Sequence, residues 1–312
     1  MTERRPGGVR APLTYPVPPM ERERLGALGI FSGDLAAFPA DTQRRVVAEL
    51  EAFGYGAIWY GEAFARETFA QGAIFLSATE RMVVASGIAN IYARDPMAMA
   101  FGGRALNELG GGRFLLGLGV AHAANVTVRG HEYGRPVATM RAYLAAMDEA
   151  EPLWRGPEAP PPDRVLAALR PRMLALAAER TAGAHPYFVP VEHTRRARAA
   201  LGPDRLLAPE QGVVLAGSRQ EARALGDRYT GFYLRAPNYR NSLVELGWGD
   251  ADLEPPGSDA LFDAVVAWGG VEELRERVRQ HREAGADHVV LNMITRDTSR
   301  PYLEEARLLA GI

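Results

Sequence analysis

The chain of 312 residues contains no cysteine and no lysine. Without cysteine there is no disulfide, no thiolate nucleophile and no zinc-thiolate site. All 36 basic residues are therefore arginines, which excludes a Schiff-base lysine, a Walker-type lysine and a lysine general base. These absences remove several large classes of enzyme before any motif is considered.

The sequence also lacks long apolar runs and a strong net charge. No run approaches the roughly 20 apolar residues that span a bilayer, so a membrane protein is not expected. The net charge of −2 provides no global positive field, so nucleic acid is not the expected partner. Residues 1–24 are rich in Pro, Arg and Glu without an apolar core, and we interpret them as a flexible arm of a cytoplasmic protein.

From residue 25 onward, short apolar runs alternate with amphipathic stretches, which predicts alternating strands and helices. The strands are expected at 25–31, 57–60, 81–91, 113–120, 164–169, 184–189, 212–216 and 287–293. The helices between them are expected at 41–53, 69–78, 96–109, 136–150, 171–181, 192–201, 219–229 and 271–284, with extra helical segments at 234–246 and 258–268.

About eight strand–helix units with nearly continuous apolar strands favour an α/β fold, a closed (β/α)8 TIM barrel, over an open doubly wound sheet. Residues 25–312 would form this single domain. A proline-rich segment at 152–163 and the segment 234–268 are predicted insertions in loops after strands, where they would line the substrate pocket.

In such barrels the chemistry lies at the carboxyl ends of the strands. Glu62 ends the second expected strand, where it can act as an acid, accept a hydrogen bond from a bound ring, or pair with an arginine; a helix N-cap or an ion pair with Arg66 is the alternative. Gly87 leaves the third strand without a side chain, which suits a flat ligand or equally a bulge.

The later strand ends carry weaker indications. Gly117 and Gly119 form only a GxG, because no third glycine completes a dinucleotide fingerprint. His122 can titrate near neutrality or serve a structural role. Arginines at a helix N-terminus, 170–173, suit an anion or are solvated charges. His185 and His193 lack an acidic cluster, so no metal is expected.

Three motifs carry a resemblance to a known family. IWYGE at 58–62, SGIANIYARDP at 86–96 and GGRFLLGLGVAH at 111–122 occur in this order, and AGADHVVLNM follows at 284–293. From about residue 25 to the end, the chain resembles the bacterial luciferase-like superfamily. It looks most similar to the deazaflavin (coenzyme F420)-dependent oxidoreductases of that superfamily.

The resemblance implies a luciferase-like barrel with a planar redox ring at its mouth. In relatives a non-proline cis peptide after the third strand supports this ring, and the matching bond here is Gly87–Ile88. The implied cofactor contacts are Glu62, Gly87, Ile88, Asn90, Gly119, Val120 and Ala121. A helix entrance formed by Arg170, Pro171, Arg172 and Met173 would hold the cofactor phosphate.

Two departures from the family bear on chemistry. Ala63 stands where many relatives carry a histidine, and His122 stands where the dehydrogenases carry a carboxylic acid. We therefore expect His122, or else Glu62, to move the proton. The lysines that clamp a sugar phosphate are absent, so a glucose-6-phosphate dehydrogenase is not expected.

The resemblance thus predicts hydride transfer between coenzyme F420 and an unidentified small organic substrate, in a homodimer. One alternative is an FMN-dependent monooxygenase that receives reduced flavin from a separate reductase. A second alternative is a flavin- or deazaflavin-binding protein without turnover.

Overall fold

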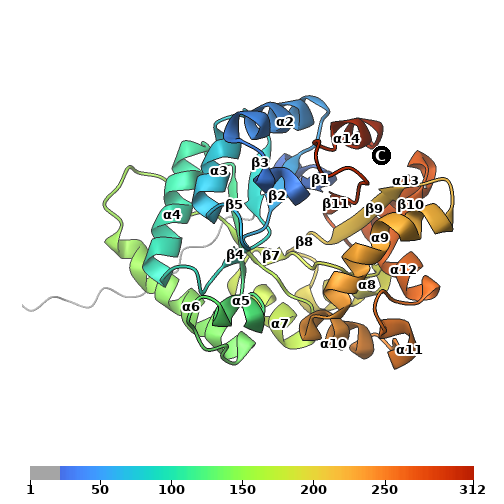
Figure 1. The fold of residues 1–312 in the computed structure, drawn as a ribbon. Coiled ribbons are helices and arrows are strands. Elements are labelled where there is room, and N and C mark those ends of the chain that lie inside the picture. The colour runs from blue at the N-terminus through green and yellow to red at the C-terminus, as the bar shows by residue number, and fades with distance from the viewer. Residues whose placement is uncertain (1–21) are drawn as a thin grey trace, which may run out of the picture.

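A computed structural model describes residues 22–312 of the chain (Figure 1). Most of the expected N-terminal arm, residues 1–21, lies outside the described residues. Its last three residues belong to a short helix, α1 (Arg22–Leu25), which leads into the first strand.

The strands form one parallel sheet in the order β10-β9-β11-β1-β2-β3-β5-β6-β7-β8, with β4 paired to β5. Figure 1 shows this sheet curled at the centre of the molecule, with helices on both sides of it. The strands are β1 (Leu28–Phe31), β2 (Ala57–Tyr60), β3 (Val83–Ser86), β4 (Ala89–Asn90), β5 (Phe114–Gly119), β6 (Arg164–Leu166), β7 (Gly183–Ala184), β8 (Leu206–Leu207), β9 (Glu210–Leu215), β10 (Val266–Gly269) and β11 (Val289–Met293).

One continuous segment, residues 206–215, pairs with two strands that are distant in the sheet order. The Ala208 backbone N–H donates to the Ala184 carbonyl at 3.0 Å, and the Val290 N–H donates to the Pro209 carbonyl at 2.9 Å. The segment therefore joins β7 on one side to β11 on the other. Beyond β9 the structure adds β10, within a stretch that was expected to be helical, so that part of the prediction was wrong.

The helices mostly follow their predicted ranges. They are α2 (Ala40–Ala52), α3 (Thr68–Leu76), α4 (Pro96–Leu109), α5 (Ala123–Thr127), α6 (Pro136–Ala150), α7 (Pro171–Arg180), α8 (Val191–Leu201), α9 (Arg219–Leu234), α10 (Pro237–Glu245), α11 (Asp250–Leu253), α12 (Asp259–Val265), α13 (Val271–Glu283) and α14 (Leu303–Leu308), with short 3-10 turns η1 (Gly33–Ala37) and η2 (Glu151–Leu153). No helix within residues 22–312 is long and apolar enough to cross a membrane.

Proline and glycine explain why several helix boundaries could be predicted from the sequence. The helices α4 and α6 have the predicted limits because each begins with proline, whose fixed φ suits the first helical turn. After α2 the chain turns at Gly54 with φ of 99°, a conformation that favours glycine.

The interior of the curled sheet is filled by a buried apolar cluster around Trp59, which also packs against two histidine rings. The ring of Trp59 lies 4.3 Å from that of His185, and its indole N–H donates to Nε2 of His288 at 3.1 Å. Gly29 makes room for this layer, because a Cβ there would lie 2.3 Å from His288 Nε2. This packed layer lies inside the sheet and supports the carboxyl ends of the strands.

The expected insertion at 152–163 lies at the wrong end of the sheet for a substrate pocket. It follows α6 and precedes β6, so it is a loop at the amino ends of the strands. It packs on α4, where Arg104 Nε donates to the Ala159 carbonyl at 2.7 Å and the Asn107 amide donates to the Pro160 carbonyl at 3.1 Å. The expectation that this loop lines the pocket was therefore wrong, because a proline-rich composition does not distinguish the two ends of a strand.

Candidate cofactor and active site

A buried ion pair between Glu62 and Arg94 ties together the ends of β2 and β4. Their side chains are only 4% and 9% exposed. Both guanidinium end nitrogens bond the carboxylate, Nη2 to Oε1 and Nη1 to Oε2, the latter at 3.0 Å. The backbone N–H groups of Asn90 and Thr68 donate to the same carboxylate at 2.8 and 3.3 Å. Glu62 thus fixes the geometry of three chain segments.

The arginine partner differs from the sequence-based alternative. Arg66 donates to the Phe38 carbonyl at 3.0 Å, whereas Arg94 pairs with Glu62 and also with Glu67 at 2.8 Å. Burial by itself would lower the pKa of Arg94, but its hydrogen bond to Glu62 raises it, and the net pKa lies above its ordinary value. With four donors around it, the Glu62 carboxylate is suited to positioning the strand ends, and its role in proton transfer stays a prediction.

The end of the third strand is interrupted at Gly87. The Gly87–Ile88 peptide bond is cis, as the resemblance implied. The Gly87 N–H donates to the Tyr60 carbonyl at 2.6 Å, and the Ile88 carbonyl accepts from the Glu62 N–H at 3.2 Å. The single strand predicted at 81–91 is consequently divided into β3 and β4.

The fifth strand brings a second glycine against this interruption. Asn90 of β4 is in register with Gly119 of β5. A Cβ on Gly119 would lie 2.4 Å from Cδ1 of Ile88, so the glycine permits the Ile88 side chain to cover the strand. Ala121 follows with φ of 54°. The structure therefore brings the predicted contacts at Glu62, 87–90 and 119–121 into one continuous surface.

His122 lies at the edge of this surface, at the start of α5. Its ring centroid is 5.5 Å from that of Tyr239, and the side chain of Asn238 lies close enough to act on its charge. Burial lowers the pKa of His122, and the nearby Asn238 amide opposes the shift. Both neighbours come from α10, so part of the segment 234–268 lies beside His122. Asn238 Oδ1 is buried and has no partner among residues 22–312.

The segment from Arg170 to Met173 forms the N-terminus of α7. Within the described chain no side chain caps this helix. Pro171 has no N–H and the Met173 N–H donates to the Arg170 carbonyl at 3.0 Å, which leaves the Arg172 N–H for an anion. Arg170 makes a half-exposed ion pair with Glu245 at 3.3 Å and acts electrostatically on Tyr133. The Tyr133 hydroxyl donates to the Ala121 carbonyl at 3.5 Å, which connects the helix entrance to the site surface.

Sequence reasoning missed an aromatic wall that faces these residues. It consists of Phe31 at the end of β1, Tyr187 after β7, and Tyr233 and Tyr239 from α9 and α10. The Tyr187 ring centroid lies 5.4 Å from Phe31, 5.1 Å from Tyr233 and 6.4 Å from Tyr239. The expected strand at 184–189 concealed this feature, because only its first residue, Ala184, belongs to β7 and the following residues leave the sheet.

His185 leaves one acceptor unsatisfied beside Gly87, the kind of atom that a bound heterocycle can satisfy. Its Nδ1 lies 2.7 Å from the Ala208 carbonyl and therefore carries the proton, so Nε2 is an acceptor. That Nε2 is buried without a partner among residues 22–312. A Cβ on Gly87 would lie 3.0 Å from it and 3.2 Å from the Phe31 ring. Burial lowers the pKa of His185 to about 4, which keeps the ring neutral.

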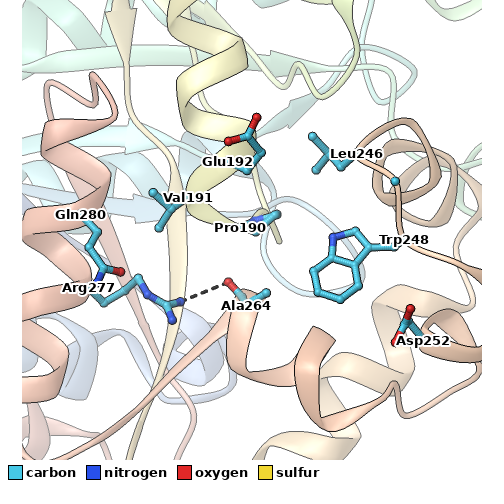
Figure 2. Close-up of a pocket in the computed structure, with 10 residues that line it drawn as sticks. Pro190, Val191, Glu192, Leu246, Trp248, Asp252, Ala264, Arg277 and Gln280 are labelled. Atoms are coloured by element: carbon cyan, nitrogen blue, oxygen red, sulfur yellow. Dashed lines mark hydrogen bonds between the residues drawn. The ribbon is translucent and has the colours of Figure 1, made fainter.

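A separate groove lies between α8 and α13 (Figure 2). It has a volume of about 630 Å³ and is lined by Pro190, Val191, Trp248 and Arg277 among others. The Arg277 guanidinium, which donates to the Ala264 carbonyl at 3.1 Å, forms part of its wall. None of the predicted site residues lines this groove, so it is distinct from the strand-end surface. Within residues 22–312, no group of three or more acidic or histidine side chains is placed to hold a metal.

Comparison with known proteins identifies the family. The family described as luciferase-like monooxygenase matches residues 24–288. The chain belongs to this family. One relative of this luciferase-like protein, from Mycobacterium tuberculosis, carries the name "Putative coenzyme F420-dependent oxidoreductase"; it is 30% identical over 171 residues, 54% of this chain and 47% of the relative. The match therefore spans about half the length of that relative.

Solved structures show the same fold at low sequence identity. The coenzyme F420-dependent tetrahydromethanopterin reductase from Methanopyrus kandleri superposes with a TM-score of 0.71 at 14% identity, covering 91% of this chain and 97% of that one. The oxygenating constituent of 3,6-diketocamphane monooxygenase from Pseudomonas putida, in complex with FMN, has a TM-score of 0.66 at 15% identity, with 91% and 97% covered. Similarity at this level supports the luciferase-like α/β fold and no finer assignment.

Proposed function

We propose that this luciferase-like protein is a coenzyme F420-dependent oxidoreductase acting on a small organic substrate. The observation that carries the proposal is the interrupted strand end at 87–90, where Gly87 lies against the unpartnered His185 Nε2 and Ile88 packs on Gly119, three residues before His122. The relative named for coenzyme F420 supports the choice of a deazaflavin.

Each group of site residues has a role in this proposal. The deazaflavin, when bound, supplies a carbon that accepts or donates hydride. The backbone at 87–90 and 119–121 supports the ring, and the α7 N-terminus at Arg170, Pro171, Arg172 and Met173 binds its phosphate. His122 holds or moves the proton, and Glu62 positions the strand ends through Arg94 and Asn90.

The closed (β/α)8 barrel is part of the same proposal. The continuous segment 206–215 contacts both β7 and β11, which would make it the seventh strand and β11 the eighth. In a closed barrel all the strand ends named above meet at one mouth.

An FMN-dependent monooxygenase is the second candidate, favoured by the FMN-bound neighbour of the same fold. The two candidates are separated by titrating the purified protein with F420 and with FMN under matched conditions, using fluorescence. Saturable F420 binding without FMN binding is expected. Tight FMN binding without F420 binding would refute the first candidate.

A binding protein without turnover is tested by screening F420 oxidation and reduction against alcohols, aldehydes and enones. We expect turnover in the wild type and its loss in His122→Gln. Unchanged activity in both His122→Gln and Glu62→Gln would refute the assigned roles. The homodimer and the cytoplasmic location are also proposals, to be checked by light scattering and by cell fractionation.

A further inference from the structure

Two tyrosine hydroxyls meet beside the candidate site. Tyr187 follows β7 and Tyr233 lies near the end of α9, and both side chains are only partly exposed. Their hydroxyl oxygens are 3.0 Å apart. The ring of Tyr239 lies 5.0 Å from that of Tyr233 and 5.5 Å from that of His122, so the pair belongs to the same wall as the proposed proton carrier.

The hydrogen bonds of this pair leave one proton without an acceptor. The Asn292 amide nitrogen donates to the Tyr187 oxygen at 2.8 Å, and Tyr233 donates to the same oxygen. Both lone pairs of Tyr187 are then occupied, and its own O–H proton has no acceptor. If the bond between the tyrosines is reversed, the spare proton is that of Tyr233. In either arrangement one donor of the pair has no acceptor among residues 22–312.

The surrounding polar groups keep this proton available. The Asn292 side chain also hydrogen-bonds the buried carboxyl group of Glu210 and lowers its pKa, so the amide presents N–H groups on this side. Glu210 in turn accepts from the Tyr229 hydroxyl at 2.7 Å and from the Phe188 N–H at 2.9 Å. These are the side-chain hydrogen bonds of Glu210 within residues 22–312, and none of them joins it to a hydroxyl group of the tyrosine pair.

We propose that the Tyr187–Tyr233 pair donates a hydrogen bond to the oxygen atom of a substrate carbonyl group, which makes aldehydes or ketones and the corresponding alcohols the substrate class. This inference rests on the proposed function, since it places the reacting oxygen beside the hydride-transfer site. Tyr187 is the catalytic residue of the pair when its proton is the spare one, and the hydrogen bond stabilises negative charge that develops on the oxygen.

The reaction balances with a reduced deazaflavin as the named reductant. Hydride from the reduced deazaflavin forms a new C–H bond at the carbonyl carbon, and the π pair of the C=O bond moves onto oxygen. A proton from His122, the proposed proton carrier, then forms the O–H bond and is replaced from water, while the tyrosine pair keeps its hydrogen bond to the oxygen. The carbonyl compound is reduced to the alcohol, the deazaflavin is oxidised, and the reverse direction oxidises the alcohol.

The test uses cyclohexanone labelled with ¹³C at its carbonyl carbon, followed by NMR. A carbonyl that accepts a hydrogen bond shifts its ¹³C signal downfield. We expect a saturable downfield shift with the wild type, a smaller one with Tyr187→Phe or Tyr233→Phe, and none with the double variant. Tyr229→Phe is the matched control, because the proton of Tyr229 is already accepted by Glu210. This control should retain the wild-type shift.

Activity and cofactor binding complete the test. The double variant should bind F420 with unchanged affinity and lose about 10²-fold in kcat for ketone reduction, the size expected for one lost oxyanion donor. Absence of a wild-type shift, or an equal shift in the wild type and the double variant, would overturn the tyrosine proposal. Failure of the wild type to bind F420 would instead count against the proposed function, which the separate titration reveals.

Discussion

Replacing Arg94 by methionine gives the most direct measurement of what holds the candidate site together. The change removes the charge and the donors that the Glu62 carboxylate receives from Arg94, but retains an unbranched side chain of similar length. Glu62 would lose its ion-pair partner in a place where its side chain is only 4% exposed. Because a buried charge without its partner is poorly solvated, we expect a loss of about 3–5 kcal/mol in unfolding free energy.

A double-mutant cycle separates the ion pair from other contacts of Arg94. In Glu62→Gln/Arg94→Met the charge is removed together with its partner, so the double variant should be more stable than Arg94→Met alone. The matched control is Arg141→Met, which breaks a surface pair with Glu179 whose side chains are 46% and 52% exposed. That control should lose less than about 1 kcal/mol.

Equilibrium unfolding in urea provides the assay, and a fluorescence titration with F420 is run on the same variants. The backbone N–H of Asn90 bonds the carboxylate, so Arg94→Met should also weaken F420 binding. The reasoning is refuted if Arg94→Met is as stable as the Arg141→Met control, or if the double variant is no more stable than Arg94→Met.

Three further changes test other parts of the site. Burial raises the pKa of Glu210 from 4.5 to about 7, so the folded protein holds this proton more tightly than the unfolded chain does. The unfolding free energy of the wild type should therefore fall by about 3 kcal/mol as the pH rises between those values. Glu210→Gln should remove this part of the pH dependence in urea titrations. Asn238→Ala should lower the pKa of His122 in an NMR titration, since the nearby Asn238 amide raises it; an unchanged pKa would contradict that influence. Gly119→Ala should weaken F420 binding by displacing the Ile88 side chain, which its Cβ would contact at 2.4 Å, whereas Gly249→Ala, with its nearest contact at 3.9 Å, should bind normally.

Local sequence patterns were sufficient for most elements of the fold. Proline at a first helical turn, as at Pro96 and Pro136, fixes φ without any help from the rest of the chain. The strand 57–60 was predicted with its observed limits, because a short apolar run between turn residues is typical of a buried parallel strand. The cis bond at Gly87–Ile88 followed from a family resemblance and not from local chemistry.

The sequence by itself determined which residues stand at strand ends, including Glu62, Gly87, Gly119 and His122. Only the tertiary structure decided their partners: Arg94 reaches Glu62 across 32 positions, and Tyr187 meets Asn292 across 105. Periodicity and turn chemistry act over a few neighbouring residues, whereas these contacts depend on how distant strands and helices pack. For that reason the strand ends could be predicted, and the buried ion pair and the tyrosine wall could not.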